Sequence, residues 1–122
     1  MVEMLDSADC GLFPVRGEGW FLPATECIAS GIPVIFPNQM AMAEQWGDGY
    51  IDVEIEGYIN ASPRYAGWMI QPSLKDLRKK MRWAYENELL IRESAKKGSR
   101  QVKAKYNWKK VTNELIELIK MI

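Results

Sequence analysis

Apolar and polar residues follow one another along the chain in blocks that predict a mixed α/β fold. Two short apolar runs, residues 10–15 and 32–36, have the length and composition of buried strands. The segment between them predicts a helix over residues 23–30, because Pro23 suits the first helical position and Gly31 suits the left-handed position after the end. In open α/β sheets, ligands bind at the loop after such a strand. The loop before Pro23 is therefore the expected position of a binding site.

Apolar and acidic residues alternate strictly further along the chain. Ile51, Val53 and Ile55 alternate with Asp or Glu within residues 48–62, which predicts a half-buried strand or an extended sheet edge. Acidic residues at every second position are more simply the solvent face of a strand than a metal site. Before this stretch a short helix is predicted over residues 38–47, between a capping asparagine and a terminating glycine.

Helical spacing dominates residues 73–122. Ser73 with Asp76 makes a box-like helix start, and Asn107 predicts the cap of the last helix. Three apolar stripes share this spacing: Leu74, Leu77, Met81 and Ala84; Ile91, Ala95, Gly98 and Val102; and Trp108, Val111, Leu115, Leu118 and Ile122. Trp108 is expected in the core. The last stripe is expected to cover the sheet or to pair with another chain.

The loop over residues 17–22 is the candidate binding loop. Free N–H groups at the start of the following helix point back at it and offer a site for an anion such as a diphosphate. Two carboxylates, Glu18 and Glu26, bracket this start. Glu26 is expected within the first turn, where the helix dipole keeps it ionised, and an ionised carboxylate there can accept two hydroxyls of a sugar diol. Taken alone, either glutamate is more often a solvated or capping residue.

Three sequence blocks, residues 8–14, 18–23 and 26–35, together resemble the donor-nucleotide half of group 1 glycosyltransferases. These are retaining enzymes of the GT-B fold that use nucleotide-activated sugars. Weaker matches at residues 67–72 and 106–108 resemble the family's later strand-helix unit and terminal helix. The resemblance implies an α/β fold: a partial Rossmann-like unit, the C-terminal half of GT-B, with a short parallel sheet and flanking helices. Residues 1–122 would form one partial donor-binding domain, N-terminally truncated, with its C-terminal helices at about 73–122.

The resemblance also implies roles for individual residues. Glu18 would be the catalytic residue that faces the donor sugar and supports charge at its anomeric carbon, and Glu26 would hold the nucleotide ribose. The other donor-binding residues would be Arg16, Gly17, Gly19, Trp20, Phe21 and Leu22. Phe21 stands where the family commonly has a glycine, and a side chain there limits how closely the backbone approaches a ligand. Arg16 is a candidate to neutralise the leaving diphosphate, although we favour a solvent-facing loop residue at this position.

The resemblance further implies partners. Three parallel strands are expected near residues 10–15, 34–36 and 68–70, with the first exposed along the sheet edge. An open apolar edge invites association, so we expect a homodimer or a partner chain that covers it. A whole GT-B enzyme has two domains, and ~122 residues is the size of one. Transfer is therefore expected to need a partner or a further domain. Neither a metal nor another cofactor is expected, since the nucleotide-sugar is the substrate.

Charge is distributed unevenly along the chain. Up to Ser62 it holds ten acidic residues against Arg16 alone, a net charge of −9, and the remainder carries +9. Such an uneven distribution of charge suggests nucleic acid or an anionic membrane surface as a partner. We favour solvated helix faces partly neutralised by the acidic half, and disfavour nucleic acid because no aromatic-rich surface accompanies the cations. A noncatalytic nucleotide-sugar-binding module and a basic scaffold for lipid or nucleic acid stay open as alternatives.

Several chemistries are excluded or disfavoured by residue counts. The chain has no histidine, which excludes His-activated nucleophiles, His-ligated zinc and imidazole acid–base catalysis. Its two cysteines, Cys10 and Cys27, support neither a disulfide scaffold nor a cysteine-rich zinc site. No apolar run approaches the ~18 residues of a membrane span, and no basic region precedes an apolar core at the N-terminus. A cytoplasmic setting is expected, with the membrane periphery as a further option.

Overall fold

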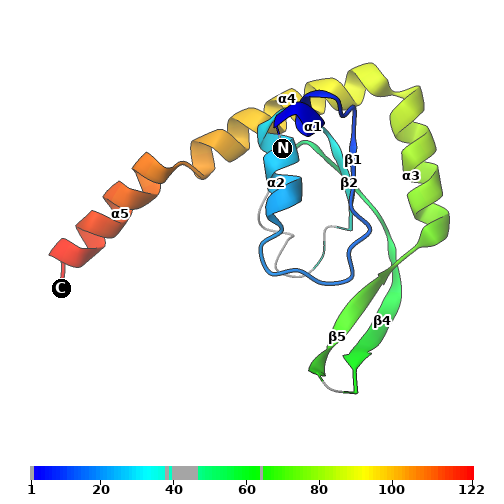
Figure 1. Cartoon of the computed structure of the whole chain (residues 1–122), viewed down its shortest axis with the longest axis horizontal. Helices are drawn as coiled ribbons and strands as arrows, with labels where there is room; N and C mark the ends of the chain where they lie inside the picture. Colours follow the sequence, from blue (N-terminus) through cyan, green and yellow to red (C-terminus); the bar gives the residue numbers. More distant parts are fainter. Residues whose placement is uncertain (1, 38, 40–46, 64) are drawn as a thin grey trace.

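The computed structural model describes residues 2–37, 39, 47–63 and 65–122. Within them the chain forms ten elements (Figure 1): α1 (Val2–Asp6), β1 (Gly11–Leu12), α2 (Leu22–Ala29), β2 (Val34–Phe36), β3 (Tyr50–Asp52), β4 (Ile55–Ser62), β5 (Tyr65–Pro72), α3 (Leu74–Glu86), α4 (Glu88–Lys105) and α5 (Trp108–Lys120). The helix predicted over residues 38–47 lies largely outside the described residues. The mixed α/β architecture with a short parallel sheet and flanking helices is confirmed.

The parallel sheet has the strand order β1-β2-β3. Gly11 pairs with Val34, and Val34 pairs in turn with Tyr50, so β2 lies in the middle. The N–H groups of Gly11 and Phe13 donate to β2 carbonyls at 2.9 and 3.0 Å. Because successive residues of a strand point their backbone groups to opposite sides, the N–H and C=O of Leu12 face the open edge. The expectation of an exposed first strand is confirmed, although β1 is shorter than the run at residues 10–15.

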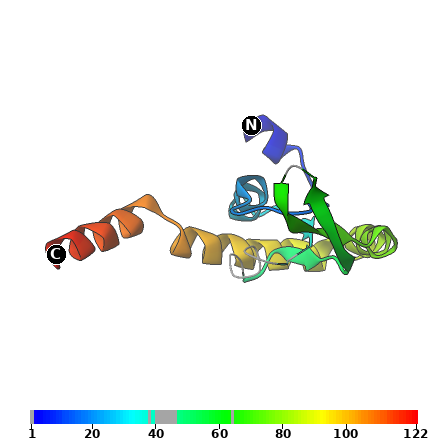
Figure 2. The ribbon, with the colours of Figure 1, turned by 90° about the horizontal axis from the view of Figure 1, so that it is seen from below.

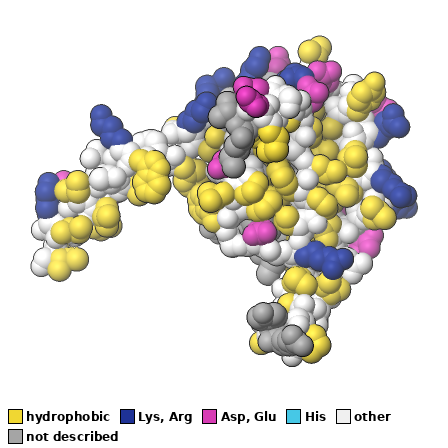
Figure 3. Space-filling view, in the orientation of Figure 1, with side chains coloured by type: hydrophobic (Ala, Val, Ile, Leu, Met, Phe, Trp, Pro, Cys, Tyr) yellow, Lys and Arg dark blue, Asp and Glu magenta, His cyan; other side chains and the backbone are white. Residues whose placement is uncertain are grey.

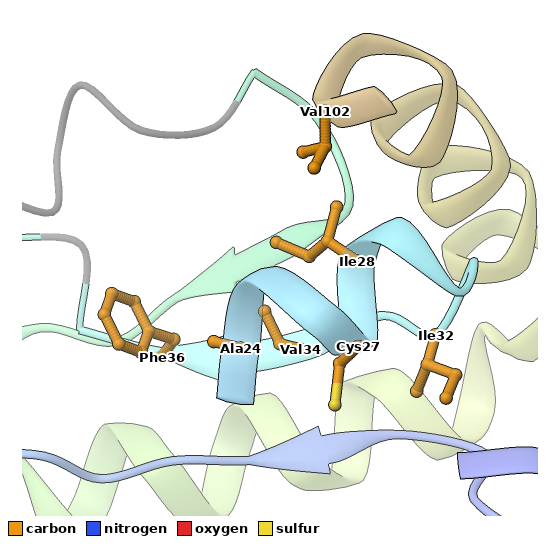
Figure 4. Close-up of a cluster of buried hydrophobic side chains, with 7 residues drawn as sticks. All are labelled: Ala24, Cys27, Ile28, Ile32, Val34, Phe36 and Val102. Atoms are coloured by element: carbon orange, nitrogen blue, oxygen red, sulfur yellow. The ribbon is translucent and has the colours of Figure 1, made fainter. Parts of the chain in front are cut away.

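Helices cover both faces of this sheet (Figures 1 and 2). On one side α2 packs with Val34 and Phe36, and this cluster also holds Ala24, Cys27, Ile28, Ile32 and Val102 (Figure 4). On the other side, α3 and α4 pack with Ile35 in a second cluster that includes Val53, Leu77, Ala84 and Ile91. All three residues of β2 are buried, as expected for a strand between two layers.

A close glycine contact seats α4 against the sheet. A Cβ added to Gly98 would collide with the carbonyl of Asp48, and a Cβ added to Gly49 would lie 3.6 Å from the Cα of Gly98. Gly49 also has a φ of +94°, which favours glycine. Next to this contact, Lys97 pairs with the Asp48 carboxylate at 3.0 Å and Gln101 donates to it at 2.9 Å. These two partners lower the pKa of Asp48. The stripe that contains Gly98 faces inward as predicted.

The predicted third parallel strand at residues 68–70 is wrong. That segment belongs to β5, which pairs antiparallel with β4 in a separate two-stranded hairpin, and β3 takes the third place in the parallel sheet. The alternation at residues 48–62 is confirmed but is divided between β3 and β4, with Val53 fully buried at the break. The physical reason is local: a turn containing Pro63 joins β4 and β5, and neighbouring strands pair more readily than distant ones.

The start of α3 ties the hairpin to the sheet. Ser73 accepts a hydrogen bond from the N–H of Asp76 at 3.3 Å, which confirms the predicted cap. The carboxylate of the buried Asp76 accepts instead from the N–H of Glu54 at 3.0 Å, while Ser73 donates to the carbonyl of Glu54 at 2.8 Å. Of the predicted stripe, Leu77 and Ala84 are buried, whereas Leu74 and Met81 are about half exposed.

The last helix contradicts the expectation for Trp108. Asn107 caps α5 through the N–H of Lys110 at 2.8 Å, as predicted. However, α5 has no buried residue, and Trp108 is 87% exposed rather than in the core. Figures 1 and 2 show α5 extending away from the sheet at the end of α4. The apolar spacing correctly identified a shared helix face, but in this chain nothing among the described residues covers that face.

Candidate functional site

Three phenylalanines anchor the candidate loop in the core. The ring of Phe21 stacks on that of Phe36, with centroids 5.9 Å apart, and meets Phe13 edge to face at 5.1 Å. The neighbouring Trp20 meets Tyr106, at the end of α4, edge to face at 4.8 Å. The ring of Phe21 is thus directed into the protein. Phe21 therefore acts as the anchor of the loop.

The upstream half of the loop is fixed to the hairpin. The carbonyl of Arg16 accepts a hydrogen bond from the N–H of Ile70 in β5 at 2.8 Å, and the nearest atom to a Cβ on Gly17 would be in Met69 at 3.9 Å. Residues 16–20 are nevertheless all exposed. A short open segment is therefore held at both of its ends, which limits the conformational entropy that a ligand would have to remove on binding.

Gly19 lies in open space. A Cβ built on it would meet no heavy atom within 4 Å, and its φ lies outside the left-handed region. Neither packing nor backbone strain therefore requires glycine at this position. The absence of a side chain leaves room against the loop backbone, on the stretch that includes Glu18.

The start of α2 offers fewer donors than the sequence predicted. The helix begins at Leu22, whose N–H donates to the carbonyl of Trp20 at 3.1 Å, and Pro23 has no N–H. Thr25 donates through both its N–H and its hydroxyl to the carbonyl of Phe21, at 3.2 and 3.1 Å. The expected set of free N–H groups is therefore reduced, and an anion here would depend more on Arg16.

Glu18 and Glu26 are both exposed. Glu26 is the fifth residue of α2, so its predicted place in the first turn is wrong; the helix starts one residue earlier than expected. Glu26 lies on the solvent side of the helix, because the buried residues of α2 are its neighbours Ala24, Thr25, Cys27 and Ile28. The eight predicted site residues thus fall on one continuous segment, which comprises the exposed residues 16–20, the half-buried Phe21 and the first two turns of α2.

Cavities also lie on the α3–α4 side of the sheet. One of about 310 Å³ is lined chiefly by Cys10, Leu12, Ile35, Met81 and Tyr85, beside the open edge of β1. Another of about 220 Å³ lies between β3 and the start of α4. Neither is lined by any of the predicted site residues. Burial raises the pKa of the Cys10 thiol to about 11, so it is protonated at neutral pH and is a poor nucleophile.

Ion pairs connect the acidic and basic halves of the chain. Arg92 pairs with Asp9 at 2.6 Å and with Glu88 at 2.8 Å, and Lys97 pairs with Asp48.

Cys10 and Cys27 are both free thiols. Among the described residues no group of three or more Cys, Asp or Glu side chains is placed to hold a metal ion.

The signal that sequence reasoning missed is the aromatic anchor. Phe13, Phe21 and Phe36 are far apart in the sequence, and only the fold brings their rings together.

In the described part of the chain, no helix has both the length and the apolar character needed to cross a membrane. Compared with known proteins, the chain matches no family model, and no curated protein matches it in sequence.

Proposed function

We propose that this chain binds a nucleotide-activated sugar at the loop of residues 16–22 and transfers the sugar with retention of configuration. The proposal includes a Rossmann-like donor domain of the GT-B type. A partner chain or a further domain would supply the acceptor site.

The observation that carries the proposal is the form of the loop. It follows a parallel strand, precedes a helix, is anchored by Phe21 and by the carbonyl of Arg16, and stays exposed between these points. Ligands of open α/β sheets bind at such a position. The unfilled space at Gly19 lies within it and has no role in packing.

Within this proposal each polar residue has a distinct role. Glu26, on the solvent side of α2, accepts hydrogen bonds from the ribose hydroxyls. Glu18 stabilises positive charge that develops at the anomeric carbon as the diphosphate leaves. The acceptor hydroxyl attacks the face from which the diphosphate departs and gives its proton to the departing phosphate oxygen, while the bond from the anomeric carbon to that oxygen breaks. Arg16 neutralises the departing phosphates.

Nucleotide binding should depend on Glu26. We expect Glu26→Ala to weaken the binding of a nucleoside diphosphate by about ten- to a hundredfold, because a charged hydrogen-bond acceptor is lost. Isothermal titration calorimetry with uridine, guanosine and adenosine diphosphates measures the effect. Glu93→Ala, an exposed glutamate on α4, is the matched control and should bind as the parent chain does. If none of the three nucleotides binds the parent chain, the proposal is wrong.

Glu18 separates catalysis from binding. Glu18→Gln is expected to lower sugar transfer, assayed with a chain that supplies the acceptor domain, by more than it weakens donor binding. Equal small effects on both would contradict the catalytic assignment. Binding that is lost in Glu26→Ala but is never accompanied by transfer would identify a noncatalytic binding module.

The open edge of β1 should mediate association. Leu12 is 41% exposed, and its backbone groups face outward from the sheet. A second copy or a partner chain covering this edge would satisfy them. We expect light scattering to show a dimer whose population rises with concentration, and Leu12→Lys to shift it toward monomer. Leu89→Lys, at an exposed position on α4, is the control. A parent chain that is monomeric at every concentration would exclude self-association.

A further inference from the structure

Helix α5 is an amphipathic helix without a partner in the described structure. Its exposed apolar residues are Trp108, Val111, Leu115, Ile116, Leu118 and Ile119, and Met121 and Ile122 continue this apolar surface after the end of the helix. Five of them, including Trp108 and Leu115, recur at alternating spacings of three and four and form one stripe. Figure 3 shows hydrophobic side chains on the lower side of the projecting arm and Lys or Arg on its upper side. Exposing this stripe to water is unfavourable, which indicates that something apolar covers it in use.

The residues around the start of α5 are strongly basic. Residues 94–113 contain seven Lys or Arg and no Asp or Glu: Lys96, Lys97, Arg100, Lys103, Lys105, Lys109 and Lys110. Lys97 pairs with Asp48 and Lys110 with Glu114. Lys96, Arg100, Lys103 and Lys109 pair with no carboxylate in the part of the chain that the structure describes. Positive charge thus remains uncompensated on α4 and at the joint with the apolar stripe.

This combination distinguishes between possible coverings of the stripe. A second α5 would match the apolar residues but would bring another set of cations next to the first. An anionic lipid surface provides an apolar layer for the stripe and negative headgroups for the cations. Lys109, beside the stripe, can extend toward headgroups while its stem lies along the apolar layer, whereas Lys120 pairs with Glu117 at 2.7 Å. Charge complementarity therefore favours the lipid surface.

We propose that α5, with the basic end of α4, is a docking element that lies flat on an anionic membrane surface. The apolar stripe enters the boundary between headgroups and acyl chains, and the lysines contact the headgroups. The projection of α5 away from the sheet allows this contact without moving the body of the protein (Figure 2). The inference does not depend on the proposed nucleotide-sugar binding, since α5 contains none of those residues.

Vesicle co-sedimentation of the full chain tests the proposal. We expect binding to vesicles of phosphatidylcholine mixed with phosphatidylserine, much weaker binding to pure phosphatidylcholine, and a decrease as salt is added. Leu115→Glu, in the middle of the stripe, should lower the affinity at least about tenfold. Asn113→Glu makes the same charge change on the polar side of α5 and should reduce binding less. Because α5 has no buried residue, both variants should melt at the temperature of the parent chain.

Three results would overturn the proposal. The first is no binding to the anionic vesicles at low ionic strength. The second is an equal loss in Leu115→Glu and Asn113→Glu, which would show that only charge matters. The third is self-association through α5, seen by light scattering and lost in Leu115→Glu, without any vesicle binding; this would assign the stripe to a second copy.

Discussion

Replacing Phe36 with alanine is expected to lower the free energy of unfolding by about 3–5 kcal/mol. Phe36 is fully buried in the α2 cluster (Figure 4), and its ring stacks on Phe21. The substitution removes apolar burial and leaves a cavity that the short strand β2 cannot close, because both of its faces are already packed. For a domain stable by about 5–15 kcal/mol, this is a large share of the total.

Urea denaturation followed by circular dichroism measures the loss. Leu89→Ala, at a position that is 82% exposed, is the control and should change stability by no more than about 0.5 kcal/mol. A loss below about 1 kcal/mol for Phe36→Ala would mean that the ring is not packed as described. Since Phe36 also supports Phe21, the variant should in addition loosen the candidate loop, with faster hydrogen exchange at its backbone amides.

Replacing Gly98 with valine is expected to lower the free energy of unfolding by about 3 kcal/mol, at the upper end for overpacking. The new Cβ would collide with the carbonyl oxygen of Asp48 and would lie 2.7 Å from its carbonyl carbon and 3.1 Å from the Cα of Gly49. Backbone atoms cannot rotate aside as a flexible side chain can. Valine is a better helix former than glycine by only a few tenths of a kcal/mol, so the collision decides the sign.

Gly19→Val is the matched control, because it makes the same change where no heavy atom lies within 4 Å. Its stability should stay within about 0.5 kcal/mol of the parent chain. Thermal melting of the two variants side by side measures the difference. If Gly98→Val proved as stable as Gly19→Val, the close approach of α4 to the start of β3 would be refuted.

The sequence predicted those parts of the fold that depend on local chemistry. Gly31 adopts φ +80° after α2, and the α4 stripe from Ile91 to Val102 is buried, because left-handed turns and helical periodicity are encoded within a few residues. Strand pairing depends on distant partners. The Ser-Pro pair at Ser62 and Pro63, after the alternating run and before the apolar residues 68–70, was the available signal for a turn between two strands.

The candidate site could be predicted as a segment but not in detail. The order of elements placed Gly19 in a loop before a helix, whereas the position of Glu26 changed with a shift of one residue in the helix start. For α5, periodicity showed which residues share a face but not whether that face is covered. Burial of Trp108 would require a long-range packing partner, which spacing alone does not report, and in the structure Trp108 stays exposed.

The three-residue strand β2 determines how the protein unfolds. Val34 and Phe36 belong to one hydrophobic cluster and Ile35 to the other, so β2 is shared by both. A shift of this strand by one position would turn Val34 and Phe36 toward the α3 side and Ile35 toward α2, which would disrupt the packing of both clusters. Neither layer can melt while the other survives, so the sheet and its helices behave as a single all-or-none unit.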